Sequence, residues 1–304
     1  MSKKIVERIQ KETNTPDLVA LLTSMSSSDL NSLMMEVLSQ KIQQISPGDL
    51  LRNYASNRFV KPSDVDFIPF LTFELDLLQK AQAFGFTALE LSPVSPLGSC
   101  AAVATVNQNK VLSALRSTEV VADATNLLAL EAVSRRKLTH FESGALRLCT
   151  VHRHLRTPYV KPPFLPHFKI FCMVTAGKDG GNLLFEKQQL VEHIRFTTDY
   201  LKSFAAVEAV RVVLKSTRKD NPMFASLYDT ITSEIKGIKF DSEQAEQPYY
   251  QIIQFKTFIT IRQKEYDIAD GGLVDWSQKL SNNRKERMLT SGIGIELLFN
   301  LLGL

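Results

Sequence analysis

The sequence predicts an α+β fold, with an antiparallel sheet flanked by helices. Strand-like apolar segments occur at 86–91, 168–174 and 207–215, and helix-like segments lie between them. Later in the chain, residues 249–261 and 264–268 flank a short turn, as the two strands of an antiparallel hairpin do. Strands that alternate with helices and then pair antiparallel favour an α+β fold over a doubly wound parallel sheet.

The composition is that of an ordinary globular protein. Of the 304 residues, 44% are hydrophobic and 22% are charged, which excludes a disordered or collagen-like chain. The three cysteines are widely spaced without a CxxC pair, which argues against a disulfide framework and fits a reducing compartment. No apolar run approaches the roughly 20 residues of a membrane helix, and the N-terminus lacks the apolar core of a signal peptide. We therefore expect a cytoplasmic protein that does not enter the membrane.

Residues 15–45 read as a pair of helices. Pro16 and Asp17 form a helix-start signal, and leucines follow at helical spacing. Residues 26–29 interrupt the pattern, and the turn at 46–48 ends the second helix. We predict an N-terminal helical segment at 1–46 that contains this hairpin, and a core domain at 47–304. A cap on the core is the preferred role for the hairpin, ahead of a separate partner-binding module.

Four further segments of the core carry a helix signal. Amphipathic helices are predicted at 67–84, 127–136 and 185–203, and Gly85 ends the first of them. Residues 291–303 read as a strand that leads into a helix, with glycines at the junction. These helices provide the two layers that would cover the predicted sheet.

The positive charge is concentrated in one stretch. The chain as a whole has a net charge of +4, whereas residues 107–169 contain ten Lys or Arg and four acids, a local charge of +6. Such a stretch could face a nucleotide, a phosphate or RNA. An ordinary solvated surface explains it equally well, because the basic cluster at 135–137 suits a helix C-terminus.

Single motifs indicate little chemistry. The glycine-rich segment 176–182 lacks the GxxxxGK[ST] spacing of a phosphate loop, so we interpret it as a turn. His152 and His154 would share one face of a strand, a spacing compatible with metal binding, but no nearby carboxylate or thiolate is evident as a third ligand. No GxSxG elbow is present. We therefore expect no metal ion, no cofactor and no catalytic residues.

The order of the segments, however, resembles the class II aminoacyl-tRNA synthetases, and the histidyl-tRNA synthetases in particular. Residues 85–94 are similar to motif 1, residues 152–155 with the returning strand 167–171 are similar to motif 2, and residues 291–298 are similar to motif 3. The resemblance spans residues 67–304 and implies a class II core. Between these motifs lie segments similar to other histidyl-type elements in the same order, at 112–119, 185–186, 207–215, 248–250 and 270–275.

Several residues expected from this resemblance are replaced. Class II synthetases use arginines to hold the ATP phosphates, because the guanidinium is a rigid and permanently charged fork. The motif 3 arginine is replaced by Leu297 and Leu298, and the arginine of the GGRYD turn by Leu273. The motif 2 glutamate is replaced by Leu155, or by Pro158 if the motif 2 arginine is Arg156 and not Arg153. The arginine before the paired tyrosines has no counterpart, and the polar residues expected on the strand after motif 2 are replaced by Met173 and Gly177. We also expect this protein to lack the C-terminal anticodon-binding domain of the histidyl family.

The resemblance and these replacements together imply a catalytically degenerate histidyl-like paralogue. We expect a regulatory protein that binds a ligand or a protein partner, for which the regulatory subunit of ATP phosphoribosyltransferase is the family precedent. The alternative is an ATP-dependent ligase that activates a non-standard carboxylate with a rebuilt site. Motif 1 forms the two-fold interface in this family, so we expect a homodimer through residues 67–93. We do not expect tRNA as a partner.

The ligand site implied by the resemblance lies over the sheet. Its polar residues stand beside apolar replacements, which suits a small anionic or partly apolar molecule better than ATP with magnesium. A competing interpretation is a relict polar network, in which Arg116 and Arg153 pair with Glu119 and Asp275. The nine residues expected to line the site are Arg116, Glu119, Arg153, Arg156, His167, Lys169, Tyr249, Tyr250 and Asp275.

Overall fold

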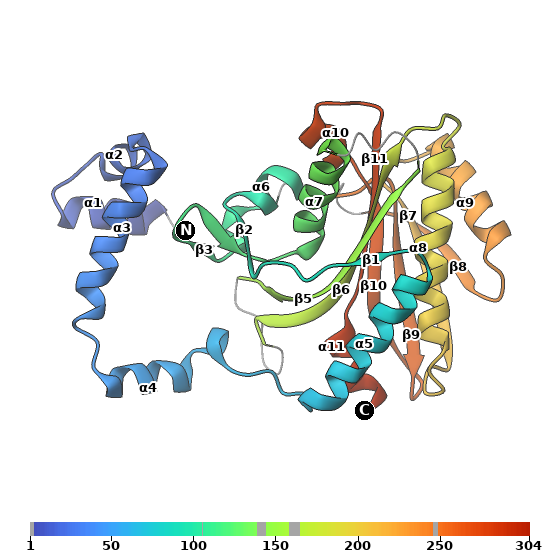
Figure 1. Cartoon of the computed structure of the whole chain (residues 1–304), viewed down its shortest axis with the longest axis horizontal. Helices are drawn as coiled ribbons and strands as arrows, with labels where there is room; N and C mark the ends of the chain where they lie inside the picture. Colours follow the sequence, from blue (N-terminus) through green and yellow to red (C-terminus); the bar gives the residue numbers. More distant parts are fainter. Residues whose placement is uncertain (1–2, 105, 139–143, 158–164, 246–248) are drawn as a thin grey trace.

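The computed structural model describes residues 3–104, 106–138, 144–157, 165–245 and 249–304. Within these ranges, eight strands form one mixed sheet that is flanked by helices, which confirms the predicted α+β class (Figure 1). In spatial order the strands are β1 (Thr87–Ala88), β5 (Leu146–Leu155), β6 (His167–Lys178), β11 (Glu286–Ile293), β10 (Lys264–Val274), β9 (Gln251–Ile261), β7 (Ala209–Ser216) and β8 (Lys239–Gln244).

The sheet is antiparallel except at its two edges. All neighbours from β5 across to β7 run antiparallel, whereas β1 pairs with β5, and β8 with β7, in parallel. A separate small sheet has the order β2 (Val94–Pro96), β4 (Thr118–Val120), β3 (Ser113–Ala114). The predominance of antiparallel pairing agrees with the prediction, and the parallel edges are an addition to it.

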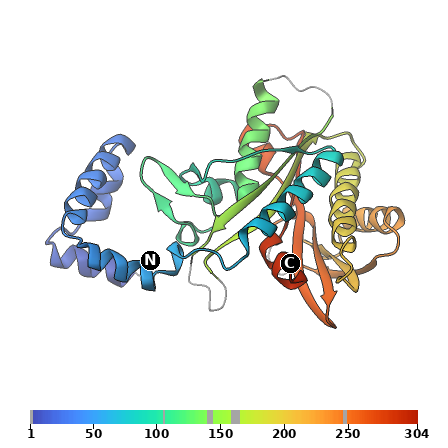
Figure 2. The same ribbon diagram turned by 60° about the horizontal axis from the view of Figure 1, so that its bottom comes forward.

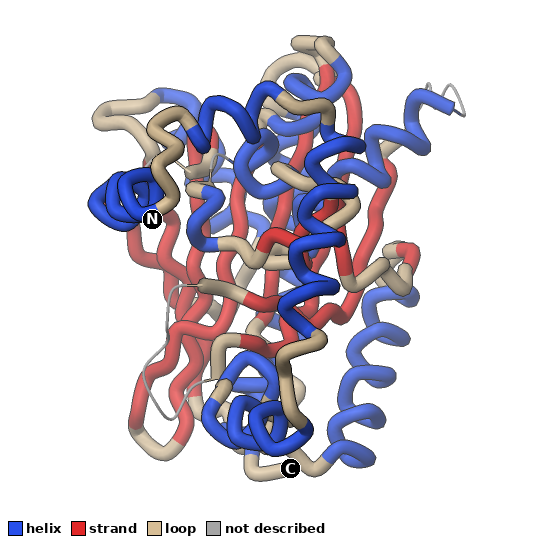
Figure 3. The backbone as a smooth tube through the Cα atoms, turned by 90° about the vertical axis from the view of Figure 1, so that its left-hand side faces the viewer, coloured by secondary structure: helices blue, strands red, loops and turns tan. Residues whose placement is uncertain are grey.

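Helices cover both faces of the sheet, and the alternation of strand residues decides which side chain meets which helix. On β5 and β6, Cys149, Phe171 and Met173 pack in one core, whereas the neighbouring Cys172 and Val174 pack in another. The first core, on what we call the α5 face, includes α5 (Phe67–Ala83), α8 (Leu184–Lys202) and α11 (Ile295–Leu302). The second, on the α7 face, includes α6 (Ser99–Ala104), α7 (Ala124–Leu138) and α10 (Trp276–Ser281). A third core packs α8 and α9 (Pro222–Glu234) against β7, β9, β10 and β11. Figure 3 shows the same strands and helices, coloured by secondary structure.

The N-terminal helices stand apart from the sheet (Figures 1 and 2). They are α1 (Lys3–Glu12), α2 (Leu18–Ser24), α3 (Ser27–Ile42) and α4 (Pro47–Ser56), and none of their described residues is buried. Asn31 on α3 reaches the β3–β4 turn, where its Oδ1 accepts a hydrogen bond from the Arg116 backbone N–H at 2.8 Å. The predicted helices at 15–45 are present as α2 and α3, but they do not cap the core as expected.

Some predicted boundaries are wrong. The strand expected at 86–91 is reduced to Thr87–Ala88, and β6 continues through Gly177 to Lys178, into the segment interpreted as a turn. The helix α3 already ends at Ile42, and residues 46–48 begin α4 instead, because Ser46 caps it and Pro47 occupies its first turn. None of the described helices combines the length and the apolarity that crossing a membrane requires.

Candidate ligand site

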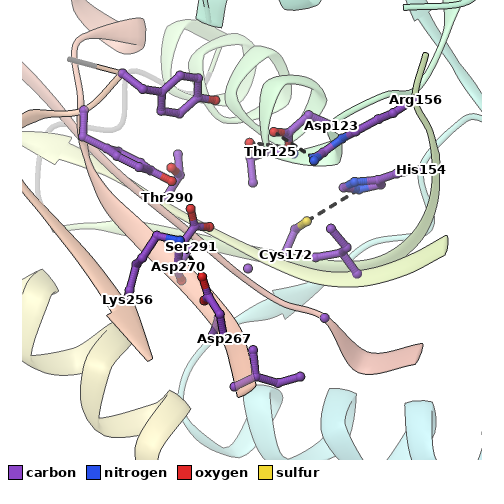
Figure 4. Close-up of a pocket in the computed structure, with 17 residues that line it drawn as sticks. Asp123, Thr125, His154, Arg156, Cys172, Lys256, Asp267, Asp270, Thr290 and Ser291 are labelled. Carbon is purple, nitrogen blue, oxygen red and sulfur yellow. Dashed lines mark hydrogen bonds and ion pairs between the residues drawn. The ribbon is translucent and has the colours of Figure 1, made fainter. Parts of the chain in front are cut away.

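A cavity of about 220 Å³ lies on the α7 face of the sheet (Figure 4). Its floor is one row of directly paired residues: Cys172 on β6, Gly292 on β11, Asp270 on β10 and Lys256 on β9. Paired residues in an antiparallel sheet point to the same face. Because Gly292 carries no side chain, the floor is open between the Cys172 thiol and the Asp270 carboxyl.

The walls of the cavity come from the start of α7, the end of β5 and the segment that precedes β9. Asp123 and Thr125 stand at the start of α7, and His154 and Arg156 stand at the end of β5. Tyr249 and Tyr250 close another side, with their ring centroids 4.8 Å apart. A neighbouring hollow of about 620 Å³ shares part of this lining and adds further cations and polar groups, Lys110, Lys215 and Gln254 among them.

Gly272 allows Tyr250 to take this position. A Cβ at residue 272 would come within 2.7 Å of Tyr250 Cδ1 and 2.6 Å of the Ile253 carbonyl oxygen. Real side chains do not approach so closely, so a larger residue at 272 would displace the Tyr250 ring. The absence of a side chain at Gly272 therefore lets the Tyr250 ring pack directly against the backbone of β10.

The two charged groups of the floor, Asp270 and Lys256, differ in their environment. Burial raises the pKa of Asp270 to about 6, although the charge of Lys256 opposes the shift. Burial would lower the pKa of Lys256, but the hydrogen bond and charge of Asp267 outweigh it and leave that pKa raised. The Lys256 Nζ atom lies 2.5 Å from Asp267 Oδ2. Lys256 is thus held as a cation, while Asp270 titrates near neutral pH.

Arg156 forms the outer rim. Its Nε donates to the Ala122 carbonyl at 2.8 Å, and its Nη2 lies 3.7 Å from Asp123 Oδ2. The guanidinium is exposed enough to meet a ligand, and the Phe168 ring supports it at 5.4 Å. An anionic group entering the cavity would find its nearest exposed cation here.

Of the nine residues expected at the site, the structure places three around the cavity: Arg156, Tyr249 and Tyr250. Three others lie on the opposite face of the sheet, because residues 153, 167 and 169 alternate with the cavity-facing ones. Arg153 is 3.1 Å from Glu296 and 3.1 Å from His167 Nδ1, and Lys169 Nζ is 2.6 Å from Glu74. These side chains tie the sheet to α5 and α11.

The remaining three expected residues have separate structural surroundings. Arg116 is exposed in the β3–β4 turn. Glu119 is fully buried and accepts hydrogen bonds from the backbone N–H groups of Gly98 at 2.7 Å and Cys100 at 3.0 Å. Asp275 precedes α10 and pairs with Lys279 at 2.9 Å. The relict network in the form expected is wrong, since Arg153 pairs with Glu296 instead.

Sequence reasoning missed much of the cavity. Asp123, His154, Cys172, Lys256 and Asp270 all line it, and none was among the expected ligand-binding residues. The register of β6, β11, β10 and β9 brings four strands into one row, and sequence spacing carries no sign of that register. Pro248, from the expected tyrosine element, and part of the basic stretch 107–169 lie outside the described residues.

Comparisons with known proteins place this geometry within a known fold. No family model matches the chain, and no curated protein matches its sequence. Among solved structures, an ATP phosphoribosyltransferase regulatory subunit/histidyl-tRNA synthetase from Bacillus halodurans is similar with a TM-score of 0.62 at 14% identity, over 80% of this chain and 82% of that one. The apo histidyl-tRNA synthetase of S. aureus also gives 0.62 at 11% identity, over 80% and 68%.

A third similar structure extends further along the chain. Pyrrolysyl-tRNA synthetase from Desulfitobacterium hafniense covers 91% of this chain and is itself covered over 80%, with a TM-score of 0.51 and 12% identity. At these identities the likeness concerns the fold alone. The chain has a class II synthetase-like fold whose structural neighbours include histidyl-tRNA synthetases, and this confirms the resemblance seen in the motifs.

Proposed function

We propose that the chain is a synthetase-like paralogue that has lost amino-acid activation and binds a small ligand or a protein partner in a regulatory role. The observation that carries the proposal is the replacement of the expected ATP-binding arginines by leucines, of which Leu273 and Leu298 are buried and Leu297 is 36% exposed. Leu273 is buried with Leu190 and Phe255, and Leu298 is buried with Phe70. A charged guanidinium at either position would have to enter an apolar core.

The cavity supports a small ligand that is anionic or partly apolar. An anionic group fits beside Arg156, and the neighbouring hollow adds Lys110 and Lys215, the latter paired with Glu243 at 2.7 Å. An apolar part fits against Tyr249 and Tyr250, whose rings supply a large contact area. The similar Bacillus halodurans protein, an ATP phosphoribosyltransferase regulatory subunit/histidyl-tRNA synthetase, is a precedent for such a role in this fold.

The alternative function is an ATP-dependent ligase that activates another carboxylate. The four cations at the cavity and its neighbouring hollow, Arg156, Lys256, Lys110 and Lys215, favour it, because they could hold phosphate groups. Pyrophosphate exchange with a panel of amino and organic acids separates the two functions. We expect no exchange above the rate without protein, and robust exchange with any acid would overturn the proposal.

The ligand part of the proposal is tested with a matched pair of arginine variants. Arg156→Ala removes the cation at the cavity rim, whereas Arg153→Ala removes a cation on the opposite face of the sheet. We expect Arg156→Ala to weaken binding of an anionic ligand by at least about tenfold, as befits a lost charged contact. Arg153→Ala should bind normally but unfold at a lower temperature, because Glu296 loses its partner.

Thermal-shift screening of amino acids, organic acids and phosphorylated metabolites supplies the readout. A hit that stabilises the wild type and the Arg153→Ala variant, but not the Arg156→Ala variant, supports the cavity as the site. Equal stabilisation of all three proteins would place the ligand elsewhere.

We further propose a homodimer through α5. The outward side of this helix exposes Phe67, Ile68, Leu71 and Leu75, the last three on one face of the helix. Light scattering should give twice the chain mass of 34.2 kDa. Ile68→Glu should shift the protein towards the monomer, and Leu138→Glu, at an equally exposed leucine on α7, should not. A wild-type monomer at micromolar concentration would refute the interface.

A further inference from the structure

A thiol and an imidazole meet at the inner end of the cavity. Cys172 Sγ lies 3.8 Å from His154 Nε2, and both side chains are at most 1% exposed. They point to the same side of the sheet. Cys172 is paired with Thr150, and His154 lies four positions further along the same strand, so its side chain faces α7 as well. His154 also accepts a hydrogen bond at Nε2 from the Ala124 backbone N–H at 3.1 Å, while its buried Nδ1 has no hydrogen-bond partner in the part of the chain that the structure describes.

A carboxylate completes the group. Asp123 comes from the start of α7, and its carboxylate oxygen, the His154 nitrogen and the Cys172 sulfur all lie within 4.8 Å of one another (Figure 4). Thr125 holds Asp123 Oδ1 through its backbone N–H at 3.0 Å and its hydroxyl at 2.7 Å. Among the described residues, the other oxygen, Oδ2, has the longer contact of 3.7 Å with Arg156 Nη2. Thr125 therefore fixes the orientation of the Asp123 carboxylate by hydrogen bonding to one of its oxygens. Residues outside the ligand set of a metal site commonly orient the ligands in this way.

The distance between His154 Nε2 and Cys172 Sγ fits two ligands of one tetrahedral metal ion. Zinc–nitrogen bonds of about 2.0–2.1 Å and zinc–sulfur bonds of about 2.3 Å, at a tetrahedral angle, place N and S roughly 3.6 Å apart. The observed 3.8 Å between His154 Nε2 and Cys172 Sγ is close to this value. A metal ion would take the Nε2 lone pair that now accepts the Ala124 N–H at 3.1 Å, so this hydrogen bond would break on metal binding.

The charges and the donor types favour the same ion. A thiolate and a carboxylate balance the two positive charges of the metal, and the imidazole is neutral, so the site as a whole carries no net charge in a poorly solvated place. Thiolate and imidazole donors select zinc over magnesium or calcium, which prefer oxygen ligands. Three protein ligands would leave the fourth position open to the cavity.

We propose that Asp123, His154 and Cys172 bind a zinc ion at the inner end of the cavity. Metal binding releases the thiol proton, and the sulfur then binds as a thiolate. The site replaces the expectation of no metal, which rested on the lack of a third ligand in the sequence: the fold supplies one from α7 and one from β6. The inference stands independently of the proposed regulatory role.

The test uses the full chain, treated with a chelator and then titrated with Co²⁺ alone. Cobalt substitutes for zinc and gives a thiolate-to-metal charge-transfer band in the near ultraviolet, together with intense visible bands when it is tetrahedral. We expect one Co²⁺ per chain with both features, and displacement of the cobalt by Zn²⁺. Asp123→Asn should weaken the binding by at least about tenfold.

Cys172→Ala and Cys149→Ala are the matched variants. Both remove a buried thiol from neighbouring strands, but Cys149 lies on the α5 face, away from the cavity. The charge-transfer band should disappear in Cys172→Ala and persist in Cys149→Ala, with folding of both checked by circular dichroism. Absence of the band in the wild type, or its persistence in Cys172→Ala, would overturn the proposal.

Discussion

Replacing Asp270 by Asn is expected to stabilise the protein at neutral pH. Burial at the cavity floor raises the pKa of Asp270 from its ordinary value of 3.8 to about 6. The folded state therefore holds this proton more tightly than the unfolded state, and stability falls as the pH rises from about 4 to about 6. Above that range the wild type carries the full cost of an ionised, poorly solvated carboxylate, which Asn does not have.

The expected gain is about 1–2 kcal/mol near pH 7, discounted because the cavity admits some water to the carboxyl. This corresponds to a rise of a few degrees in Tm, and the gain should shrink as the pH falls towards about 4. Asp267→Asn is the control, because it removes the same charge from the same strand. Since Asp267 is largely exposed and pairs with Lys256, its loss should leave Tm unchanged or lower it slightly.

Thermal unfolding of both variants across this pH range provides the measurement. A lower Tm for Asp270→Asn at neutral pH would show that the pairing of Asp270 with Lys256 outweighs the cost of burying its charge. Equal shifts in the two variants would show that only the net charge of the chain matters.

The helices and the long strands could be predicted from the sequence because their signals are local. The amphipathic pattern at 67–84 became α5, and the apolar pattern at 168–174 became the centre of β6. The short β1 was overestimated, since alternation at 86–91 describes how side chains would face and not whether a neighbouring strand is available. Thr87 and Ala88 pair with Leu148 and Cys149 of β5, and Leu89 adds a single hydrogen bond, from its N–H to the Cys149 carbonyl.

The cavity could be predicted only in part, because it depends on register. The paired tyrosines were identified from the motif order, but the row of Cys172, Gly292, Asp270 and Lys256 exists only once four strands are aligned. The alternation of β5 could in principle have separated Arg153 from His154, because adjacent residues of a strand face opposite sides. Which of the two sides contains a cavity depends on how α7 packs on the sheet, and the sequence pattern does not predict that packing.

Gly271→Ala is expected to cause a large loss of stability. A Cβ at this position would lie 2.5 Å from Phe255 Cζ, 2.5 Å from Ser291 Cβ and 2.6 Å from the Thr290 carbonyl oxygen. One of these neighbours is backbone in the adjacent strand β11, so β10 and β11 would have to separate. Overpacking of this kind costs about 3 kcal/mol or more, which should lower Tm by roughly 6 °C or more in a scanning calorimeter.

Gly292→Ala is the matched control on the neighbouring strand. Its added Cβ would be 3.1 Å from Ile170 Cγ2, a side chain that can move, and 3.4 Å from the Phe171 carbonyl oxygen. We expect a change in unfolding free energy within about 1 kcal/mol, because strain and the lower chain entropy of alanine oppose each other. The added methyl group also enters the cavity floor between Cys172 and Asp270, so any ligand or metal ion bound there should bind more weakly. Equal destabilisation by the two variants would contradict the close approach of β10 and β11 at Gly271 as the cause.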